Sequence, residues 1–154
     1  MHRTPRTART IALAAAGLLA LTACAPALTI NAYAPSDGTR VDLTNELRGL
    51  NLLILAAEQG GEGLVQGALA NRTGGTVTFT LTVDGAAPVE VEVDPATTVY
   101  LGTADGEQVL LDTVAKAPGT FLEATLDADG ESASFQLPVL DGTLPEYAGS
   151  VPQG

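Results

Sequence analysis

The chain has 154 residues, with 18 acidic and only 7 basic side chains, one cysteine, one histidine and no tryptophan. Its length suits a single domain. The net charge of −11 repels phosphate backbones, so the composition argues against a nucleic-acid partner.

The first 23 residues form the pattern of an export signal. Residues 1–10 carry three arginines and no acidic residue, and residues 11–23 are an uncharged, mostly apolar run. A basic segment followed by a short apolar run is typical of a secretory signal peptide. A transmembrane helix needs about 20 apolar residues, and this run is shorter. We therefore predict that residues 1–23 are removed as a lipoprotein signal peptide.

Cys24 is the predicted lipidation site. It is the only cysteine, and it directly follows Leu21-Thr22-Ala23. This tetrapeptide fits the lipobox, in which the thiol receives a diacylglycerol before the peptidase cuts ahead of it. Two or three acyl chains hold a protein firmly at a bilayer, each buried methylene contributing about 0.8 kcal/mol. The sequence thus predicts a palmitate-type anchor at the extracytoplasmic face of the cell membrane.

The mature chain left by this cleavage lacks the side chains that many catalytic and metal sites need. Beyond Cys24 it has no histidine, methionine, tryptophan or second cysteine, and its four basic and 18 acidic residues give a net charge of −14. Nucleophilic sites built with histidine cannot form, nor can the usual zinc and copper sites. We predict no catalytic residue, no cofactor, no metal ligand and no enzymatic activity.

After the cleavage site, residues 24–40 are predicted to be a lipidated tether. It includes a possible first strand at 30–34 and ends with the turn signal Ser36-Asp37-Gly38. The apolar run over 50–57 predicts a strand buried on both faces, although a short helix also fits. A turn over 59–63 separates it from a further predicted strand over 64–71.

The clearest pattern is a two-residue alternation. Over 77–83, apolar residues alternate with Thr78, Thr80 and Thr82; over 89–94, valines alternate with acidic residues. This period predicts an antiparallel hairpin with one face in the core and one in water. Shorter strands are expected over 99–101 and 109–114. A last hairpin over 122–139 is expected to turn at Asp129-Gly130.

These elements predict an all-β domain over 41–140. Seven or eight short antiparallel strands separated by glycine turns indicate an immunoglobulin-like or cupredoxin-like β-sandwich. A jelly roll or an open barrel is the alternative. Residues 141–154 contain Pro145 and Pro152, and we expect them to form a flexible C-terminal tail.

Three local features have both a functional and a plain interpretation. The segment 127–131 resembles a fragment of a calcium loop, but it lacks the glutamate twelve positions along, so a hairpin turn explains it better. Asn71-Arg72-Thr73 has the form of a glycosylation sequon, and a plain turn is the preferred interpretation. The outward Thr78, Thr80 and Thr82 are a candidate binding surface, although strand propensity alone explains them better.

Three segments, residues 33–38, 48–52 and 69–75, resemble the strand–loop–strand pattern of small actinobacterial LpqE-type lipoproteins. Those proteins are similar in turn to periplasmic copper chaperones of the PCu(A)C type. The resemblance implies a cupredoxin-like sandwich over most of 30–140 and a location in the cell envelope. The chaperones use histidine and methionine ligands, and the mature chain contains neither, so no metal residue is carried over.

The function expected from the sequence is that of a non-enzymatic, lipid-anchored envelope protein. It would act as a binding or interaction module for an envelope protein, a wall component or a small ligand. A calcium-type divalent cation carrier is the first alternative, because carboxylates are plentiful. A carboxylate-based hydrolase is the second, and it would require two acids that converge in a concave pocket.

Overall fold

The computed structural model of the protein describes residues 36–152. The predicted signal peptide, Cys24 and the possible strand at 30–34 lie outside the described residues. No helix within 36–152 is long and apolar enough to cross a membrane.

The described part of the chain is all-β, as the sequence predicted, and it has nine strands rather than seven or eight. The additional strand, β1, lies partly in the segment predicted to be a tether. Its four residues are too few and too polar to show an alternating pattern. The strands are β1 (Thr39–Asp42), β2 (Leu47–Ala56), β3 (Gly63–Asn71), β4 (Val77–Val83), β5 (Val89–Val93), β6 (Thr97–Leu101), β7 (Val109–Leu111), β8 (Thr120–Ala128) and β9 (Glu131–Leu140).

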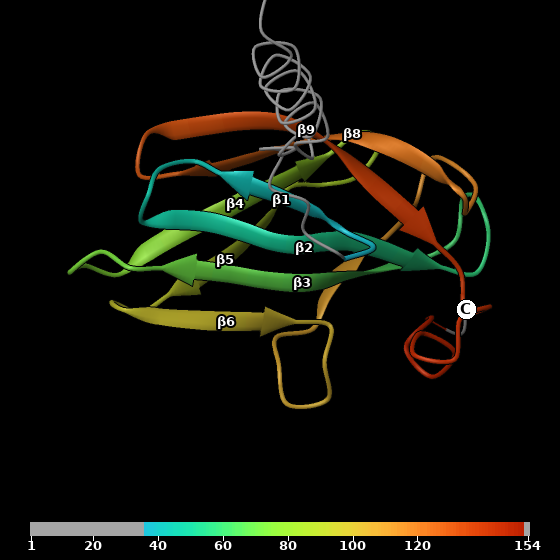
Figure 1. Cartoon of the computed structure of the whole chain (residues 1–154). Coiled ribbons are helices and arrows are strands. Elements are labelled where there is room, and N and C mark those ends of the chain that lie inside the picture. Colours follow the sequence, from blue (N-terminus) through green and yellow to red (C-terminus); the bar gives the residue numbers. More distant parts are fainter. Residues whose placement is uncertain (1–35, 153–154) are drawn as a thin grey trace, which may run out of the picture. The chain divides into compact units, whose positions relative to one another are not determined.

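The strands form two halves, seen in Figure 1 with β8 and β9 above β2, β3 and β6. One half has the order β2–β3–β6, with β1 added to β2 and β7 added to β3; the other has the order β5–β4–β8–β9. The chain crosses between the halves after β3, after β5 and after β7. Of the seven main strands, the first, second and fifth (β2, β3 and β6) face the third, fourth, sixth and seventh (β4, β5, β8 and β9). This is the order of an immunoglobulin-like sandwich, except that the fourth strand, β5, pairs with β4.

One side of the sandwich is closed by a parallel strand pair, whereas we expected only antiparallel pairs. Ile54 and Leu55 of β2 lie opposite Val139 and Leu140 of β9. Strand alternation gives the face on which a residue lies but does not identify the partner strand, so this pair was not predictable from the pattern. The opposite side stays open between the edge strands β5 and β6, and the acidic side chains along β5 discourage pairing with another chain.

The core lies between the two halves and is mainly aliphatic, with Phe79 as its one fully buried aromatic ring in the described chain. The predicted alternation over 77–83 is confirmed, since Val77, Phe79, Leu81 and Val83 are all at most 8% exposed. Burial of each such side chain contributes about 1.5–3 kcal/mol. The core therefore fixes the orientation of both outer faces.

A second apolar cluster lies on the outer face of β2 and β3. It consists of Leu53, Leu55 and Leu64, covered by Tyr147 from the C-terminal segment. This cover explains why residues 52–56 of the run predicted over 50–57 are buried on both faces, while Ala57 is exposed. It also differs from the expected flexible tail, because Tyr147 is only 7% exposed. The prolines and glycines of the segment form turns that bring one aromatic ring back onto the sheet.

Candidate functional site

The outer face of β2, β3 and β6 carries a groove of about 450 Å³. It begins beside the second apolar cluster and continues towards the open edge of the sheet. Its lining residues are Leu50, Asn51, Gln66, Gly67, Ala68, Thr98, Tyr100, Thr103 and Tyr147.

The floor of the groove lies where a bulge in β2 brings its backbone close to that of β3. The register of β2 and β3 shifts between Leu50 and Leu53, and Asn51 has a positive φ of 52°. Opposite, Gly67 has a φ of 141°, and a Cβ there would lie 2.8 Å from the carbonyl oxygens of Leu50 and Asn51. Only glycine tolerates this backbone conformation and this close approach.

The Asn51 side chain holds the segment that precedes β1. Its Oδ1 accepts a hydrogen bond from the Gly38 amide at 2.7 Å. Asn tolerates a left-handed backbone better than most residues. The bulge that shapes the groove therefore also holds the end of the predicted tether.

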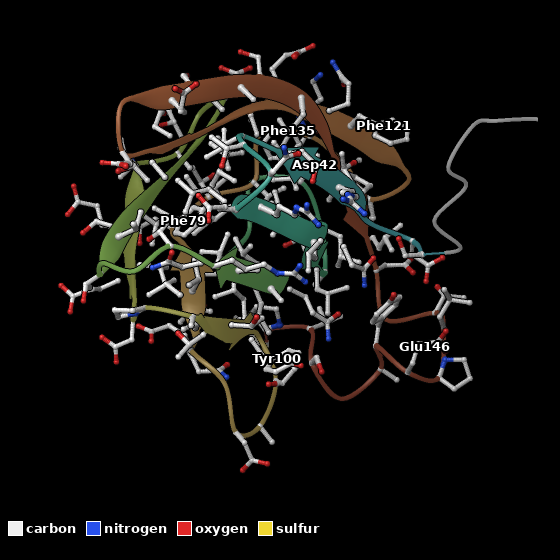
Figure 2. The ribbon with its side chains drawn as sticks, turned by 60° about the vertical axis from the view of Figure 1, so that its left-hand side comes forward. Asp42, Phe79, Tyr100, Phe121, Phe135 and Glu146 are labelled. Carbon is white, nitrogen blue, oxygen red and sulfur yellow. The ribbon has the colours of Figure 1, made fainter. Side chains whose placement is uncertain are left out.

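Two tyrosines stand at the groove walls. Tyr100 lies opposite Ala68 in the β3–β6 register, and it is 61% exposed. Figure 2 shows its ring projecting from the lower side of the domain. Tyr147, at the other end, donates its hydroxyl to Asp37 Oδ2 at 2.7 Å. Burial, followed by the hydrogen bond to Asp37, raises the pKa of Tyr147 to about 12.

Gln66 supplies an unpaired polar atom. Its Oε1 is buried and has no hydrogen-bond partner among the described residues. A buried acceptor left without a donor costs about 1–3 kcal/mol, and such an atom in a native fold calls for a partner from water or a ligand. Thr98 and Thr103, which carry hydroxyls, line the same groove. Together they offer donors and acceptors around a mostly apolar floor.

None of the residues 36–152 that line this groove is charged, in a chain with 18 acidic side chains. A second hollow of about 380 Å³ adjoins it and shares Thr103; Leu64, Gln108 and Ser150 are among its lining residues, all of which are uncharged. Acidic side chains lie at both ends of the groove: Asp37 accepts the Tyr147 hydrogen bond, and Asp105 and Glu107 line a third hollow, which shares Thr98 and Tyr100 with the groove. The site is therefore a neutral strip on an acidic surface.

The predicted threonine surface lies on the other half of the sandwich. Thr78 is exposed, and Thr80 and Thr82 are half-buried. Thr80 lies opposite Asp127 and Thr82 opposite Thr125 on β8. The threonines thus face outward, as the alternation predicted, and they border two hollows that also contain acidic residues.

One of these hollows, of about 430 Å³, contains Asp84 and Glu123. Both residues are exposed, and the Glu123 carboxylate accepts a hydrogen bond from the Gln136 side-chain amide. Two acids thus line one hollow, whereas the hydrolase alternative requires two acids that converge on one point. One of them is engaged by an amide, and both are open to solvent.

The calcium-like segment 127–131 forms a hairpin turn, as predicted from its sequence. Asp129 and Gly130 have φ values of 52° and 82°, between β8 and β9. Positive φ at both central residues is the geometry of a tight two-residue hairpin. No group of three or more acidic, histidine or cysteine side chains suited to a metal ion occurs within 36–152.

Asn71 of the sequon is a structural residue of the turn after β3. It is 0% exposed. Its Nδ2 donates to the carbonyl oxygens of Gly75 at 2.8 Å, Val93 at 2.9 Å and Asp94 at 3.2 Å. Its Oδ1 accepts from the amide and the hydroxyl of Thr73 at 2.9 and 2.7 Å. The side chain is therefore fully engaged inside the fold and closed to modification.

Two of the four basic residues after Cys24 converge on one carboxylate. Arg40 contacts Asp42 at 2.9 Å and Arg48 contacts it at 3.3 Å. The hydrogen bond from Arg40, which outweighs the smaller effect of burial, lowers the pKa of the Asp42 carboxyl. These arginines lie on the surface of β1 and β2, outside the groove lining.

No family model and no curated protein matches this chain. The resemblance to LpqE-type lipoproteins stays a prediction. Of the three segments on which it rests, 48–52 lies in β2 and ends just past the bulge residue Asn51, and 69–75 comprises the end of β3 and the following turn. The segment 33–38 lies partly outside the described residues. The fold and the site thus define an all-β domain with a neutral surface groove.

The groove was not predictable from the sequence alone. One sequence pattern could have identified Tyr100: Val99 and Leu101 point inward by alternation, so the large ring between them must point outward. Gln66 gave a weaker signal, as a polar residue within an apolar run. The bulge at Asn51 and the return of Tyr147 depend on contacts between distant segments, which periodicity does not report.

Proposed function

We propose that this protein is a non-enzymatic binding module, anchored through a lipid on Cys24 to the extracytoplasmic face of the cell membrane, and that it takes its ligand in the Tyr100 groove. The observation that carries the proposal is the combination of an exposed aromatic ring with the unpaired, buried Oε1 of Gln66. Ligand sites are mostly apolar concavities with a few convergent polar groups.

The chemistry of the lining favours binding over catalysis. Hydroxyls, amides, two tyrosine rings and aliphatic carbon line the groove, and its lining contains no carboxylate, imidazole or amine, the groups that most often serve as general acids and bases. The groove lies on paired strands anchored by the core, so its shape is set before a ligand arrives. A preorganised surface of this kind reduces the entropic cost of association.

The tether supports a function close to the membrane. Asp37, which binds Tyr147 at the groove wall, is 13 residues from Cys24. A fully extended chain spans about 3.3–3.6 Å per residue, so the groove end would remain within roughly 45 Å of the anchor. Such a module would sample the layer directly above the bilayer.

The two alternatives have less support. The hydrolase would use Asp84 and Glu123, which share a hollow but are both exposed, whereas a catalytic acid is usually raised in pKa by burial. The calcium carrier would use the acids of the 127–131 hairpin, which is a tight turn and lacks the ligand spacing of a calcium loop.

The anchor is tested by labelling. Cells that express the full chain are grown with a radioactive or alkyne-tagged palmitate analogue, with and without globomycin. We expect label on the protein, accumulation of lipidated, uncleaved precursor with globomycin, and no label on Cys24→Ala. Unlabelled protein in the cytosol would contradict the proposed address.

The groove is tested with the chain 24–154, made without acylation through Cys24→Ala and labelled with nitrogen-15. Fractionated envelope material from the producing cell is added, and backbone and side-chain amide signals are followed. We expect shifts at Gln66, Gly67 and Thr98, with Thr125 on the opposite half unchanged. Shifts confined to the threonine surface of β4, or none at all, would overturn the groove as the binding site.

A further inference from the structure

We infer that the ligand of the Tyr100 groove is a neutral saccharide. This inference rests on the proposed function, because it names the chemical class that the same groove would hold. Four properties of the site carry it: its elongated form, its aromatic walls, its unpaired acceptor and its lack of charge.

The form of the site suits a short chain of rings. The Tyr100 groove and the second hollow share Thr103, so they lie next to each other along β3 and the loop after β6. Both hollows are within the size range of small-molecule sites, about 300–1,000 Å³. Both are wide open to solvent, which suits a ligand that keeps part of its hydroxyl groups in water.

The aromatic wall suits the apolar face of a sugar ring. Tyr100 is 61% exposed and stands beside Ala68 on the floor. The face of an aromatic ring carries partial negative charge, and the axial C–H groups of a pyranose carry partial positive charge. A sugar ring stacked on Tyr100 would therefore cover exposed apolar surface on both partners.

The polar groups suit hydroxyls rather than a ligand with acceptors alone. Gln66 Oε1 has no donor among the described residues and is covered in the ligand-free fold, so a ligand hydroxyl would pair with it only once this half-buried side chain turns into the groove. The hydroxyls of Thr98 and Thr103 both donate and accept. Saccharide hydroxyls have the same dual character. A ligand that lacks a donor at the Gln66 position would leave this buried oxygen unpaired, and such sites reject those ligands.

The charges around the site disfavour anionic ligands. The lining is neutral, and Asp105 and Glu107 lie across the ring of Tyr100 in a chain whose residues from Cys24 onward carry a net charge of −14. Uronic acids and phosphorylated glycans would be repelled by this field. A neutral saccharide meets no such penalty.

An extended peptide is a poorer occupant because the adjacent sheet edge is already engaged. Addition of a peptide strand requires free backbone groups along β6. The Glu107 amide donates to the carbonyl of Tyr100 at 2.8 Å, and the Gly102 amide donates to the carbonyl of Glu107 at 2.8 Å. The loop after β6 thus occupies part of the edge that a peptide would need.

The test uses the chain 24–154 with Cys24→Ala and a panel of defined neutral trisaccharides: maltotriose, cellotriose, mannotriose and N-acetylchitotriose. Binding is measured by calorimetry and by amide shifts at Gln66. We expect at least one trisaccharide to bind at millimolar concentration or below. Tyr100→Ala and Gln66→Leu should each weaken it about tenfold, the effect of one lost contact of about 1.4 kcal/mol.

Two controls distinguish ring stacking from general damage. Tyr100→Phe keeps the ring and should bind nearly as well as the parent. Phe121→Ala removes another exposed ring, 53% exposed, from β8 on the other side of the domain (Figure 2), and this variant should bind the trisaccharide as the parent does. Circular dichroism of each variant checks its fold.

Three results would overturn the inference: no trisaccharide binds, Tyr100→Ala binds as well as the parent, or a trisaccharide of glucuronic acid binds as tightly as the neutral ones. If envelope fractions shift the groove signals while no trisaccharide binds, the proposed binding function is retained and the saccharide inference is rejected. If neither shifts them, both proposals fall.

Discussion

At the scale of single residues, the Asn71 side chain links the turn after β3 to the end of β5. Its amide donates to carbonyl oxygens that are 4 to 23 residues away. Each buried hydrogen-bonding group left without a partner costs about 1–3 kcal/mol. Asn71 therefore matters more than its position at the end of a strand suggests.

We expect Asn71→Ala to lower the free energy of unfolding by about 2–4 kcal/mol, because several buried groups lose their partners together. Asn71→Asp, which cannot donate, should lose a similar amount at the same side-chain size. Urea unfolding measures both. Asn45→Ala, at an exposed position, is the matched control, and equal stability of the Asn71 and Asn45 variants would contradict the role assigned to Asn71.

Tyr147 gives the fold a dependence on alkaline pH. Its pKa is about 12 in the folded protein and about 10 in an unfolded chain. The folded state thus holds this proton more tightly, so its contribution to stability is complete below pH 10 and is lost as the pH rises to about 12. The cause is burial, followed by the hydrogen bond to Asp37.

Tyr147→Phe should remove this alkaline phase, since phenylalanine has no proton to lose. The measurement is urea unfolding of both proteins in steps above pH 9, together with an ultraviolet titration of the tyrosines. We expect the parent to lose more stability than the variant between pH 10 and pH 12. Identical slopes for the two proteins would show that Tyr147 titrates as it does in an unfolded chain.

At the scale of elements, the C-terminal segment acts as a cover for the outer face of β2 and β3. Tyr147 packs on Leu53, Leu55 and Leu64, whereas Leu144 in the same segment is 43% exposed. One segment therefore contains both a buried anchor and an exposed residue of similar apolar character. Comparing substitutions at Tyr147 and Leu144 therefore shows whether burial on the sheet, and not apolar character alone, makes this segment stabilising.

We expect Tyr147→Ala to cost about 2–4 kcal/mol, as truncations of buried large side chains do. It should also increase binding of a hydrophobic dye, because the three leucines lose their cover. Leu144→Ala should change stability by less than about 0.5 kcal/mol. Equal effects of the two substitutions, measured by thermal unfolding, would mean that the segment does not cover the sheet.

How well an element could be predicted depended on whether its signal is local. The alternation over 77–93 directly gave β4, β5 and their inward faces, because core packing enforces a period of two residues. The bulge at Asn51, the parallel pairing of Val139 and the return of Tyr147 arise from contacts between segments far apart in sequence. The groove is built from these non-local features, and for that reason the sequence predicted the scaffold but not the site.

At the scale of the whole molecule, charge is distributed unevenly between surface and site. The residues from Cys24 onward carry 18 acidic and four basic side chains, and two of the four basic residues already contact Asp42. Folding brings the remaining acids closer together, and their mutual repulsion destabilises the compact state. The groove lining takes no part in this repulsion, because it is uncharged.

Salt should therefore affect folding and binding differently. Added sodium chloride screens the acids, since the screening length falls from about 30 Å at 0.01 M to about 8 Å at 0.15 M. We expect the melting temperature of the chain 24–154 to rise over this range, while the affinity of the groove for a neutral trisaccharide stays constant. A melting temperature that falls with salt would mean that attractive pairs outweigh repulsion. An affinity that falls with salt would mean that a charged contact, and not the neutral lining around Gln66 and Tyr100, holds the ligand.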